Sequence, residues 1–274
     1  MFAARVHVLM AREARVGVVI RRGPSKKVCT VLWDRRNDQF QLGQWLNGRI
    51  YERRSDLSPD GKYLIYFAMN GRWESEAAGS WTAISRAPYL KAIAIFPKGD
   101  CWNGGGLFTN KTSYWLNEGL GHSELRNTSE VRVDPNPEIL MSTNFGGECP
   151  GVYYPRLMRD GWEYIERRGS RGQTIDVFEK PLHHGWTLRK LAHSQSGAPP
   201  GKGVYWDEHE LLRPETDNLI KCATWEWAEL DGKRLVWSAE GRLFAAYLRA
   251  KGMVDEHELF DFNTLHYEPI EAPY

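Results

Sequence analysis

The side chains that could do chemistry in this sequence are scattered along the chain and form no known catalytic motif. The adjacent residues His183 and His184 in "KPLHHGWTL", with His193 nearby, are candidate metal ligands. Neighbouring side chains on a strand point to opposite faces, so both imidazoles could reach one ion only from a loop. An exposed turn explains the pair better, and we expect no metal and no cofactor.

Glycine, serine and acidic stretches carry no enzyme signature. "CWNGGGLF" lacks both the GxGxxG spacing and the Gly-Lys-Ser/Thr ending of phosphate-binding loops. Ser142, Ser170 and Ser194 stand in no GxSxG elbow. "DEHEL", found at 207–211 and 255–259, lacks the HExxH spacing of a helical zinc site. The catalytic residues, if there are any, are therefore unknown.

One enzymatic interpretation stays open, that of a glycoside hydrolase. Such an enzyme needs two carboxyl groups about 5 to 9.5 Å apart around the sugar, and Trp and Tyr could stack on sugar rings. The carboxylates on or beside expected strands are Asp34, Asp56, Asp160 and Glu226. The alternative is that these are ordinary residues of strand ends and turns.

The charge balance argues against a global electrostatic field. Lys and Arg number 36 against 35 Asp and Glu, so the net charge of +1 gives no general attraction for nucleic acid or anionic lipid. The N-terminal 23 residues contain no apolar run as long as a signal peptide or membrane span. Cys29, Cys101, Cys149 and Cys222 show no CxxC spacing, so we expect buried free thiols in a cytoplasmic protein.

The elements that must position these residues are short strands. Twelve Trp, twelve Tyr and ten Phe accompany short apolar runs broken by Gly, Asn and Asp, which is typical of β-structure. Asp60-Gly61, Asp160-Gly161 and Asp231-Gly232 each precede an apolar run. Glycine accepts positive φ without steric cost, so we predict three equivalent strand-to-strand corners.

A longer repeat organises these strands. The two "DEHEL" copies begin at Asp207 and Asp255, a separation of 48 residues, and a four-stranded propeller blade occupies roughly 40 to 50. The predicted fold is all-β, a single β-propeller of five four-stranded blades with an irregular third blade. The blades cover approximately residues 1–48, 49–99, 100–150, 151–215 and 216–274 of one domain, 1–274.

Two details of this arrangement are specific enough to check. The fourth blade is expected to begin with a strand at 152–158, "VYYPRLM", and to contain a long loop at 193–203, "HSQSGAPPGKG". The N-terminal strand Val6–Met10 is expected beside the last blade, Lys233–Phe262, because ring closure covers exposed strand edges. The segment "FDFNTLHYEPIEAPY" would then pack across that closing blade.

The stretch "LSPDGKYLIYF", residues 57–67, closely resembles the repeat of TolB-type and WD-like β-propellers. In that repeat a Ser-Pro-Asp-Gly-Lys corner joins the first and second strands of a blade. The corners at Asp160 and Asp231 keep the Asp-Gly pair without the Ser-Pro. The resemblance implies the fold and leaves the activity open.

The predicted function is that of a non-enzymatic binding or scaffold propeller that engages a protein partner. The alternative is a five-bladed, glycoside-hydrolase-like propeller acting on a carbohydrate. The long loops in the irregular third unit either form the binding surface or are insertions without a function. Aromatic anchors beside adaptable polar groups are common in binding sites. The candidate binding residues are Trp102, Asn103, Phe108, Asn144, His183, His184 and Trp186.

Overall fold

The computed structural model describes residues 2–24, 26–118, 123–135, 145–146, 148–216 and 218–274. It divides into two compact units, and within the described residues the chain passes from one unit to the other four times. The N-terminal unit comprises Phe2, His7–Arg159 and Leu265–Tyr274. The C-terminal unit comprises Ala3–Val6 and Asp160–Thr264. A segment near the N-terminus, Ala3–Val6, thus belongs to the C-terminal unit, and the C-terminal segment Leu265–Tyr274 belongs to the N-terminal unit.

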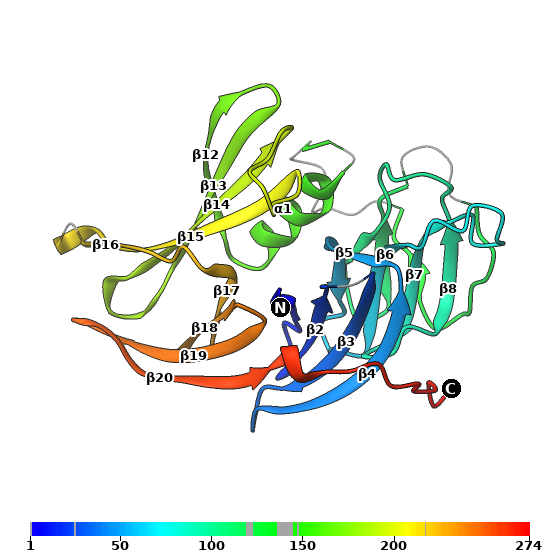
Figure 1. Ribbon diagram of the computed structural model, residues 1–274, viewed down its shortest axis with the longest axis horizontal. Helices are drawn as coiled ribbons and strands as arrows, with labels where there is room; N and C mark the ends of the chain where they lie inside the picture. Colours follow the sequence, from blue (N-terminus) through cyan, green and yellow to red (C-terminus); the bar gives the residue numbers. More distant parts are fainter. Residues whose placement is uncertain (1, 25, 119–122, 136–144, 147, 217) are drawn as a thin grey trace. The chain divides into compact units, whose positions relative to one another are not determined.

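Three sheets form the N-terminal unit, and their strands follow one another in chain order (Figure 1). The first sheet contains β1 (Arg5–Met10), β2 (Val16–Arg22), β3 (Lys27–Asp34) and β4 (Gln39–Asn47). The second contains β5 (Arg49–Leu57), β6 (Tyr63–Met69), β7 (Ser80–Arg86) and β8 (Ala92–Pro97). The third contains β9 (Gly106–Phe108), β10 (Ser113–Leu116) and β11 (Arg132–Val133), of which β10 and β11 pair in parallel. The predicted irregularity of the third unit is therefore present.

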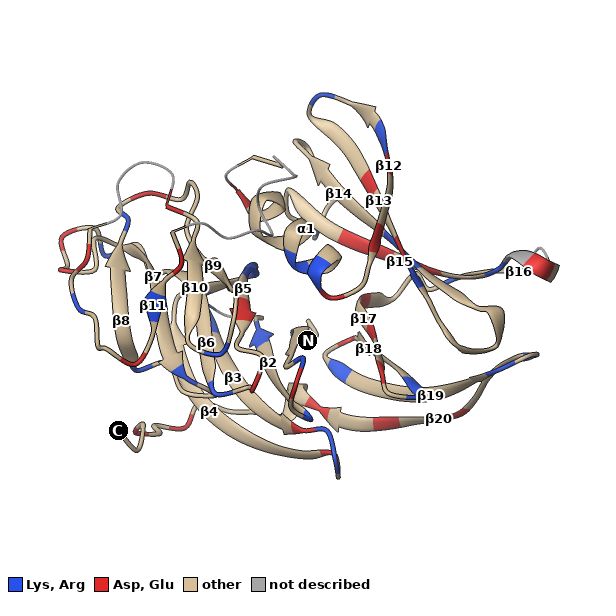
Figure 2. Cartoon of the chain, turned by 180° about the vertical axis from the view of Figure 1, so that it is seen from behind, with Lys and Arg blue, Asp and Glu red and all other residues tan. Residues whose placement is uncertain are grey.

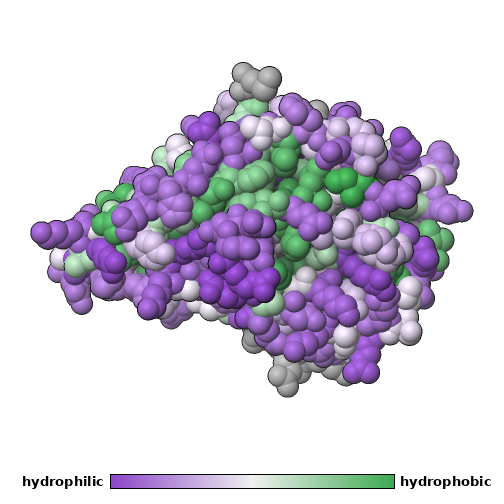
Figure 3. Space-filling model, turned by 90° about the horizontal axis from the view of Figure 1, so that it is seen from below, coloured by the Kyte–Doolittle hydropathy of each residue, from purple (hydrophilic) through white to green (hydrophobic). Residues whose placement is uncertain are grey.

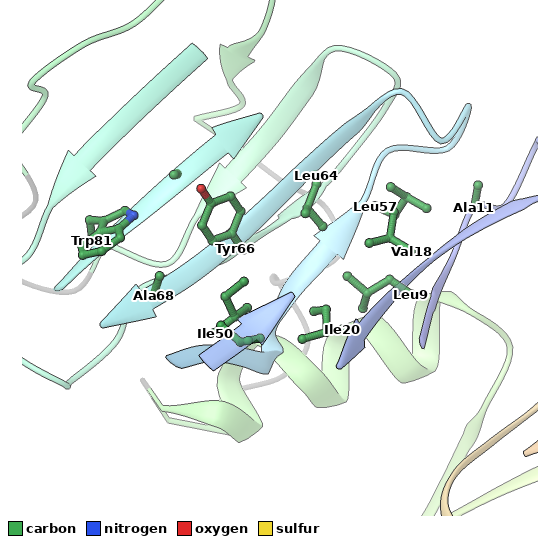
Figure 4. Close-up of a cluster of buried hydrophobic side chains, with 12 residues drawn as sticks. Leu9, Ala11, Val18, Ile20, Ile50, Leu57, Leu64, Tyr66, Ala68 and Trp81 are labelled. Atoms are coloured by element: carbon green, nitrogen blue, oxygen red, sulfur yellow. The ribbon is translucent and has the colours of Figure 1, made fainter. Parts of the chain in front are cut away.

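The first two sheets share one apolar core. Side chains alternate along a strand, so Val18 and Ile20 of β2 lie on the same face, where they pack with Ile50 and Leu64 of the second sheet. Figure 4 shows these side chains, with Trp81, pointing toward one another from both sheets. Each fully buried aliphatic side chain stabilises the fold by about 1.5–3 kcal/mol.

The Ser-Pro-Asp-Gly corner joins β5 to β6 as predicted, and Ser58 explains its composition. The buried Ser58 hydroxyl donates to Asp60 Oδ1 at 2.7 Å and accepts from the backbone N–H groups of Lys62 and Tyr63 at 3.0 and 2.9 Å. Gly61 has φ +75°, a left-handed conformation that favours glycine. An added Cβ there would also overlap Val16 Cγ2.

The C-terminal unit holds two further sheets, again with strands in chain order. One contains β12 (Glu163–Ser170), β13 (Gln173–Pro181), β14 (Thr187–Gln195), β15 (Tyr205–Arg213) and β16 (Asn218–Lys221). The other contains β17 (Trp225–Asp231), β18 (Arg234–Ala239), β19 (Arg242–Arg249) and β20 (Gly252–Asp261). Short 3-10 turns are η2 (His183–Gly185), η3 (Pro214–Thr216) and η4 (Phe262–Thr264). The two "DEHEL" copies lie in β15 and β20, the fourth strand of each sheet.

The predicted strand at 152–158 is wrong, because these residues lie in the helix α1 (Cys149–Arg159). Every residue from Gly151 to Leu157 is buried, so this part of the helix is enclosed on all sides, although Val, Tyr and Pro155 had favoured a strand. Asp160-Gly161 consequently follows a helix, and Gly161 with φ +89° is its left-handed terminus. The prediction of three equivalent strand corners is therefore wrong at this position.

Two further strand predictions for the fourth unit need correction. His193–Gln195 belong to β14, so the expected long loop begins only at Ser196. No strand was predicted at β14, because the adjacent charged residues Arg189 and Lys190 interrupt its apolar pattern, although the strand has partners on both sides. β16 adds a fifth strand where four were expected. Gly232, with φ +63° between β17 and β18, occupies a strand corner as predicted.

The terminal segments match the closure prediction only in part. Val6 donates its N–H to Glu226 Oε2 at 3.2 Å and accepts from Ser238 Oγ at 2.8 Å, so it contacts β17 and β18. The strand neighbour of β1, however, is β2. Residues Leu265–Tyr274 pack in the N-terminal unit rather than across the last sheet, contrary to prediction. All five sheets are open, so a closed propeller ring is not established by strand pairing.

Among the described residues, no helix is both long and apolar enough to cross a membrane.

Candidate functional site

Two neighbouring loops of the N-terminal unit each expose a tryptophan. Residues 70–79 connect β6 to β7, and residues 98–105 connect β8 to β9. The loops are joined where Lys98 donates its N–H to Ser80 O at 2.8 Å and Ser80 Oγ donates to Asp100 O at 2.5 Å. The loops and their exposed residues Trp73 and Trp102 are called the tryptophan surface below.

The first loop holds Trp73 in a defined position. Asn70 and Gly71 both donate their N–H groups to Gly79 O, at 3.0 and 3.1 Å, which closes the base of the loop. The indole lies directly on Gly79, where any Cβ would overlap the ring. Trp73 nevertheless remains 51% exposed, so much of its surface faces solvent.

The second loop is held by an arginine from β5. Arg54 donates through Nη1 to the carbonyl oxygens of Cys101, at 2.8 Å, and of Asn103. The backbone N–H of Trp102 donates to Asp100 Oδ1 at 2.8 Å, and Lys98 Nζ lies 2.7 Å from Asp100 Oδ2. These contacts order the backbone, while the Trp102 side chain stays 58% exposed. A fixed backbone with an exposed indole is suited to binding without a large ordering cost.

Charges of both signs surround the two indoles. Arg72, Glu74 and Glu76 are exposed on the first loop, and at the base of the second the buried Lys98 side chain pairs with the exposed Asp100 carboxylate. Figure 2 shows acidic and basic residues interspersed over the N-terminal unit. The space-filling view likewise shows hydrophobic side chains between hydrophilic ones on the face it presents (Figure 3). Aromatic anchors within a mixed polar rim are typical of protein–protein interfaces.

The predicted binding residues do not form one surface. Trp102 and Asn103 lie on the tryptophan surface, whereas Phe108 is fully buried in the core of the N-terminal unit. Trp186 is 1% exposed in the C-terminal unit, where its Nε1–H donates to Arg249 O at 2.9 Å. Both aromatic rings are therefore core residues and offer no exposed anchor. Asn144 lies outside the described residues.

The histidine pair lies in an exposed turn, as the sequence analysis favoured. His183 and His184 form η2 with Gly185, and His184 has φ +59°. His183 Nε2 lies 3.2 Å from Gly232 O. No group of three His, Cys, Asp or Glu side chains able to hold a metal occurs among the described residues.

A cluster of polar side chains surrounds an irregular segment of β5. Neither the cluster nor the irregular segment was predicted from the sequence. The register jumps from Tyr51–Phe67 to Asp56–Ile65, so the residues between form a large bulge. Arg156 of α1 donates to the bulge carbonyls of Glu52, at 3.2 Å, and Ser55, and its Nη2 lies 3.0 Å from His7 Nε2. The helix thus satisfies backbone groups that have left the strand ladder.

Glu52 carries the main negative charge of this cluster. Its carboxylate lies 3.2 Å from Arg22 Nη2 and 3.3 Å from Arg53 Nη1. Burial alone would raise the pKa of Glu52, but the attraction of Arg22, Arg53 and Arg49 outweighs it and lowers that pKa. The cluster is an internally paired structural element that fixes the bulge beneath the tryptophan surface through the neighbouring Arg54.

The carboxylates considered for sugar hydrolysis have structural roles. Asp56 is buried, pairs with Arg159 and accepts the Phe108 N–H at 2.8 Å. The partly exposed Asp34 pairs with Arg36, whose hydrogen bonds lower the Asp34 pKa to about 2. In the C-terminal unit, Glu226 accepts the Val6 N–H. Asp34, whose pKa is lowered by Arg36, is therefore a poor candidate for a general acid at neutral pH.

A buried lysine forms a third cluster, in the C-terminal unit. Lys190 Nζ lies 3.2 Å from His209 Nε2 and 3.8 Å from Asp207 Oδ2, and 4.7 Å from the centre of the Trp162 ring. His209 Nδ1 lies 3.3 Å from Trp225 O, which fits a neutral imidazole that donates there and accepts from Lys190. The lysine is 1% exposed and its neighbours occupy its donors, so this cluster is structural.

Comparisons with known proteins identify no family. No family model matches the chain, and no curated protein matches it. Hydrazine synthase of Kuenenia stuttgartiensis is 10% identical over 88% of this chain and 76% of its own, with a TM-score of 0.30. An uncharacterised protein of Listeria monocytogenes EGD-e is 9% identical over 93% and 66%, with a TM-score of 0.27. The AtxE2 isopeptidase is 11% identical over 95% and 53%, with a TM-score of 0.36.

The chain thus spans between about half and three quarters of these neighbours' lengths. At TM-scores of 0.27 to 0.36 these structures indicate neither the fold nor the activity of this protein.

Proposed function

We propose that this chain is a non-enzymatic binding module that engages a protein partner through the tryptophan surface. The observation that carries the proposal is the exposure of Trp73 and Trp102, 51% and 58%, on adjoining loops with hydrogen-bonded backbones. Tryptophan is enriched among the residues that dominate binding energy at protein interfaces. The mixed charges around the two rings would form the polar rim of the contact.

We further propose a five-bladed propeller as the architecture, each sheet forming one blade. Successive sheets in chain order support this, as does the assignment of Ala3–Val6 to the unit that contains the last sheet. TolB-type propellers provide the resemblance at residues 57–67. We place the protein in the cytoplasm, since all four cysteines are free thiols.

The alternative, a hydrolase acting on a carbohydrate, has weaker support. The two exposed indoles could stack on sugar rings, but Asp56 is fixed by Arg159 and by a backbone N–H. Asp34 is held ionised by Arg36. A carboxylate with a lowered pKa is a poor general acid at neutral pH, and the reaction needs one acid and one base or nucleophile.

The test is a quantitative affinity purification from the native host, with tagged wild type and the double variant Trp73→Ala/Trp102→Ala. We expect a stoichiometric protein with the wild type, and at least a ten-fold lower yield of that same protein with the variant, because single anchors often contribute about 2 kcal/mol or more. Mass spectrometry with isotope-labelled standards measures the ratio.

The matched control is Leu125→Ala/Val133→Ala, which removes two other exposed apolar side chains, 48% and 40% exposed, of the same unit. Partner yield should equal that of the wild type. Equal recovery with all three proteins would contradict the proposal. Sugar release from host polysaccharide by the wild type, lost in a folded Asp34→Asn variant, would instead favour the hydrolase.

A further inference from the structure

The segment Leu265–Tyr274, called the docked segment below, lies on the N-terminal unit without joining any sheet. In Figure 1 it is the dark red end of the trace, running from beside β4. The contacts described below are made by individual side chains, with no strand ladder. Such a segment can bind or leave as a peptide does, because no backbone pairing of the sheets depends on it.

Tyr274 makes the most specific contact. Its hydroxyl donates to Lys91 O at 2.6 Å and accepts the Arg86 backbone N–H at 3.0 Å. The ring lies 4.7 Å from the Arg86 guanidinium carbon, and its centre is 6.2 Å from that of Tyr89 in an edge-on arrangement. Two hydrogen bonds to one phenol oxygen discriminate tyrosine from phenylalanine, since backbone groups would otherwise lose their partner.

Gln44 of β4 makes the second contact and links the segment to the turn between β7 and β8. Its side-chain nitrogen donates to Ile270 O at 2.7 Å. Its side-chain oxygen accepts from the backbone N–H groups of Leu90 and Lys91, at 2.8 and 3.0 Å. One side chain therefore positions both the bound segment and the turn that binds Tyr274.

Tyr267 makes the third contact, at the other end of the segment. Its ring lies 4.6 Å from Lys27 Nζ and is edge-on to Trp45 with centres 6.2 Å apart. Tyr267 remains 59% exposed, so this contact is peripheral. Between the two tyrosines the sequence is "EPIEAP", with two acidic residues and two prolines.

The charges of segment and surface are complementary. The segment carries Glu268 and Glu271, and the surface presents Lys27 and Lys91. Arg86 lies under the Tyr274 ring, but its charge is paired with Glu130 at 2.8 Å. Proline fixes φ and removes an N–H donor, so "YEPIEAPY" favours an extended conformation and loses little entropy on binding. Aromatic surfaces that bind extended, proline-containing peptides are a recurring recognition mode.

We propose that the surface formed by Gln44, Trp45, Arg86, Tyr89 and Lys91 is a peptide-recognition site, which the docked segment occupies in the same chain. The external ligand of this site is an extended peptide of a partner protein. This peptide is acidic, contains proline and has a tyrosine at the position that Tyr274 occupies. The site is separate from the tryptophan surface, and its test does not depend on that proposal.

The experiment uses a fluorescein-labelled synthetic peptide of residues 266–274 and the full-length chain, followed by fluorescence polarisation. In the wild type the docked segment competes at a high effective concentration, so we expect weak binding. In Tyr267→Ala/Tyr274→Ala the site is vacated, and we expect binding at least about ten-fold tighter. Adding Gln44→Ala to that variant should abolish binding. A peptide with phenylalanine at position 274 should bind about ten-fold more weakly than the tyrosine peptide.

Circular dichroism and melting curves verify that each variant is folded. Tyr274→Phe retains the ring and removes only the hydroxyl, so it serves if the double alanine variant unfolds; it should bind the peptide more tightly than the wild type. Equal affinity of vacated and wild-type chains would overturn the proposal. Concentration-dependent dimers of the wild type, dissociated by the peptide, would also overturn it, because the outside occupant would then be a second copy of this chain.

Discussion

The Arg159 guanidinium binds both oxygens of the Asp56 carboxylate, with Nη1–Oδ2 and Nη2–Oδ1 distances of 2.6 and 2.8 Å. The pair joins the last residue of α1 to β5, and both side chains are nearly excluded from solvent. Arg159 Nη1 also donates to Phe108 O at 3.2 Å, so the pair extends to β9. A bidentate geometry with additional hydrogen bonds offsets the cost of removing both charges from water.

Replacing Arg159 with alanine should therefore strongly destabilise the N-terminal unit. The substitution leaves a buried carboxylate without its cation, and breaking such a pair from one side costs about 3–5 kcal/mol. Urea denaturation followed by tryptophan fluorescence measures the change.

Arg36→Ala is the matched control, since Arg36 and Asp34 form a similar ion pair on the surface, where Arg36 is 70% exposed. Exposed pairs contribute little. We expect an unchanged midpoint for Arg36→Ala, and equal midpoints for both variants would show that the Asp56–Arg159 pair has no special role.

Gly61→Ala should destabilise more than Gly232→Ala. Both glycines have positive φ, at +75° and +63°, so both alanines are strained by about 1–2 kcal/mol. Only at Gly61 would the new Cβ overlap Val16 Cγ2, whereas nothing lies within 4 Å at Gly232. Denaturant midpoints of the two variants give the comparison, and a larger loss at Gly232 would mean that the corner is less tightly packed than described.

Glu52 should contribute to stability at neutral pH and lose its effect in acid. Its pKa is lowered in the folded state from the usual value of 4.5, so its contribution is complete above that pH. The contribution is lost as the pH falls through the lower folded pKa. Glu52→Gln should therefore melt below the wild type at pH 7, and the gap should narrow below about pH 4.5. Melting curves from pH 7 to 3 test this, and a gap that widens in acid contradicts it.

Cys101 should be the one thiol of the four that reacts in the folded protein. The expectation of buried thiols is correct for Cys29, Cys149 and Cys222 and wrong for Cys101, which is exposed in the loop between β8 and β9. Burial raises the pKa of the Cys29 and Cys222 thiols to about 12, which suppresses their reactive thiolate forms. Iodoacetamide at pH 8 should add one group to the native chain and four in denaturant. Two or more rapid native adducts would contradict this burial pattern.

The strands of the first two sheets could be predicted because their local signals agree with their tertiary environment. Val18 and Ile20 alternate with residues of the opposite face, and Ser58 to Gly61 specify a turn through their own side chains and positive φ. α1 could not be predicted, since Val152 and Tyr153 favour strands locally. Its buried contacts to the β5 bulge, made by Arg156, are tertiary and leave no local trace in the sequence.

Of the two exposed tryptophans of the candidate site, one could be predicted from the sequence and the other could not. Trp102 stood out as an aromatic residue within a glycine-rich loop, but Trp73 lies in a hairpin connection without comparable glycine density. The proximity of the two loops follows from the pairing of β7 with β8, which the sequence predicts only as a general meander. Phe108 and Trp186 were misjudged because the same aromatic residue types serve cores and binding surfaces.

The most direct test of the proposed protein-binding function uses the position of Cys101 beside Trp102. The rate of iodoacetamide labelling at Cys101 is measured by mass spectrometry for the purified chain and for the chain in host lysate. The concentration of unreacted iodoacetamide is made the same in both samples. A partner bound at the tryptophan surface should slow labelling in lysate at least about ten-fold, and Trp73→Ala/Trp102→Ala should restore the purified rate. A wild-type rate that is the same in lysate and in buffer would contradict the proposal that this surface is occupied by a protein partner.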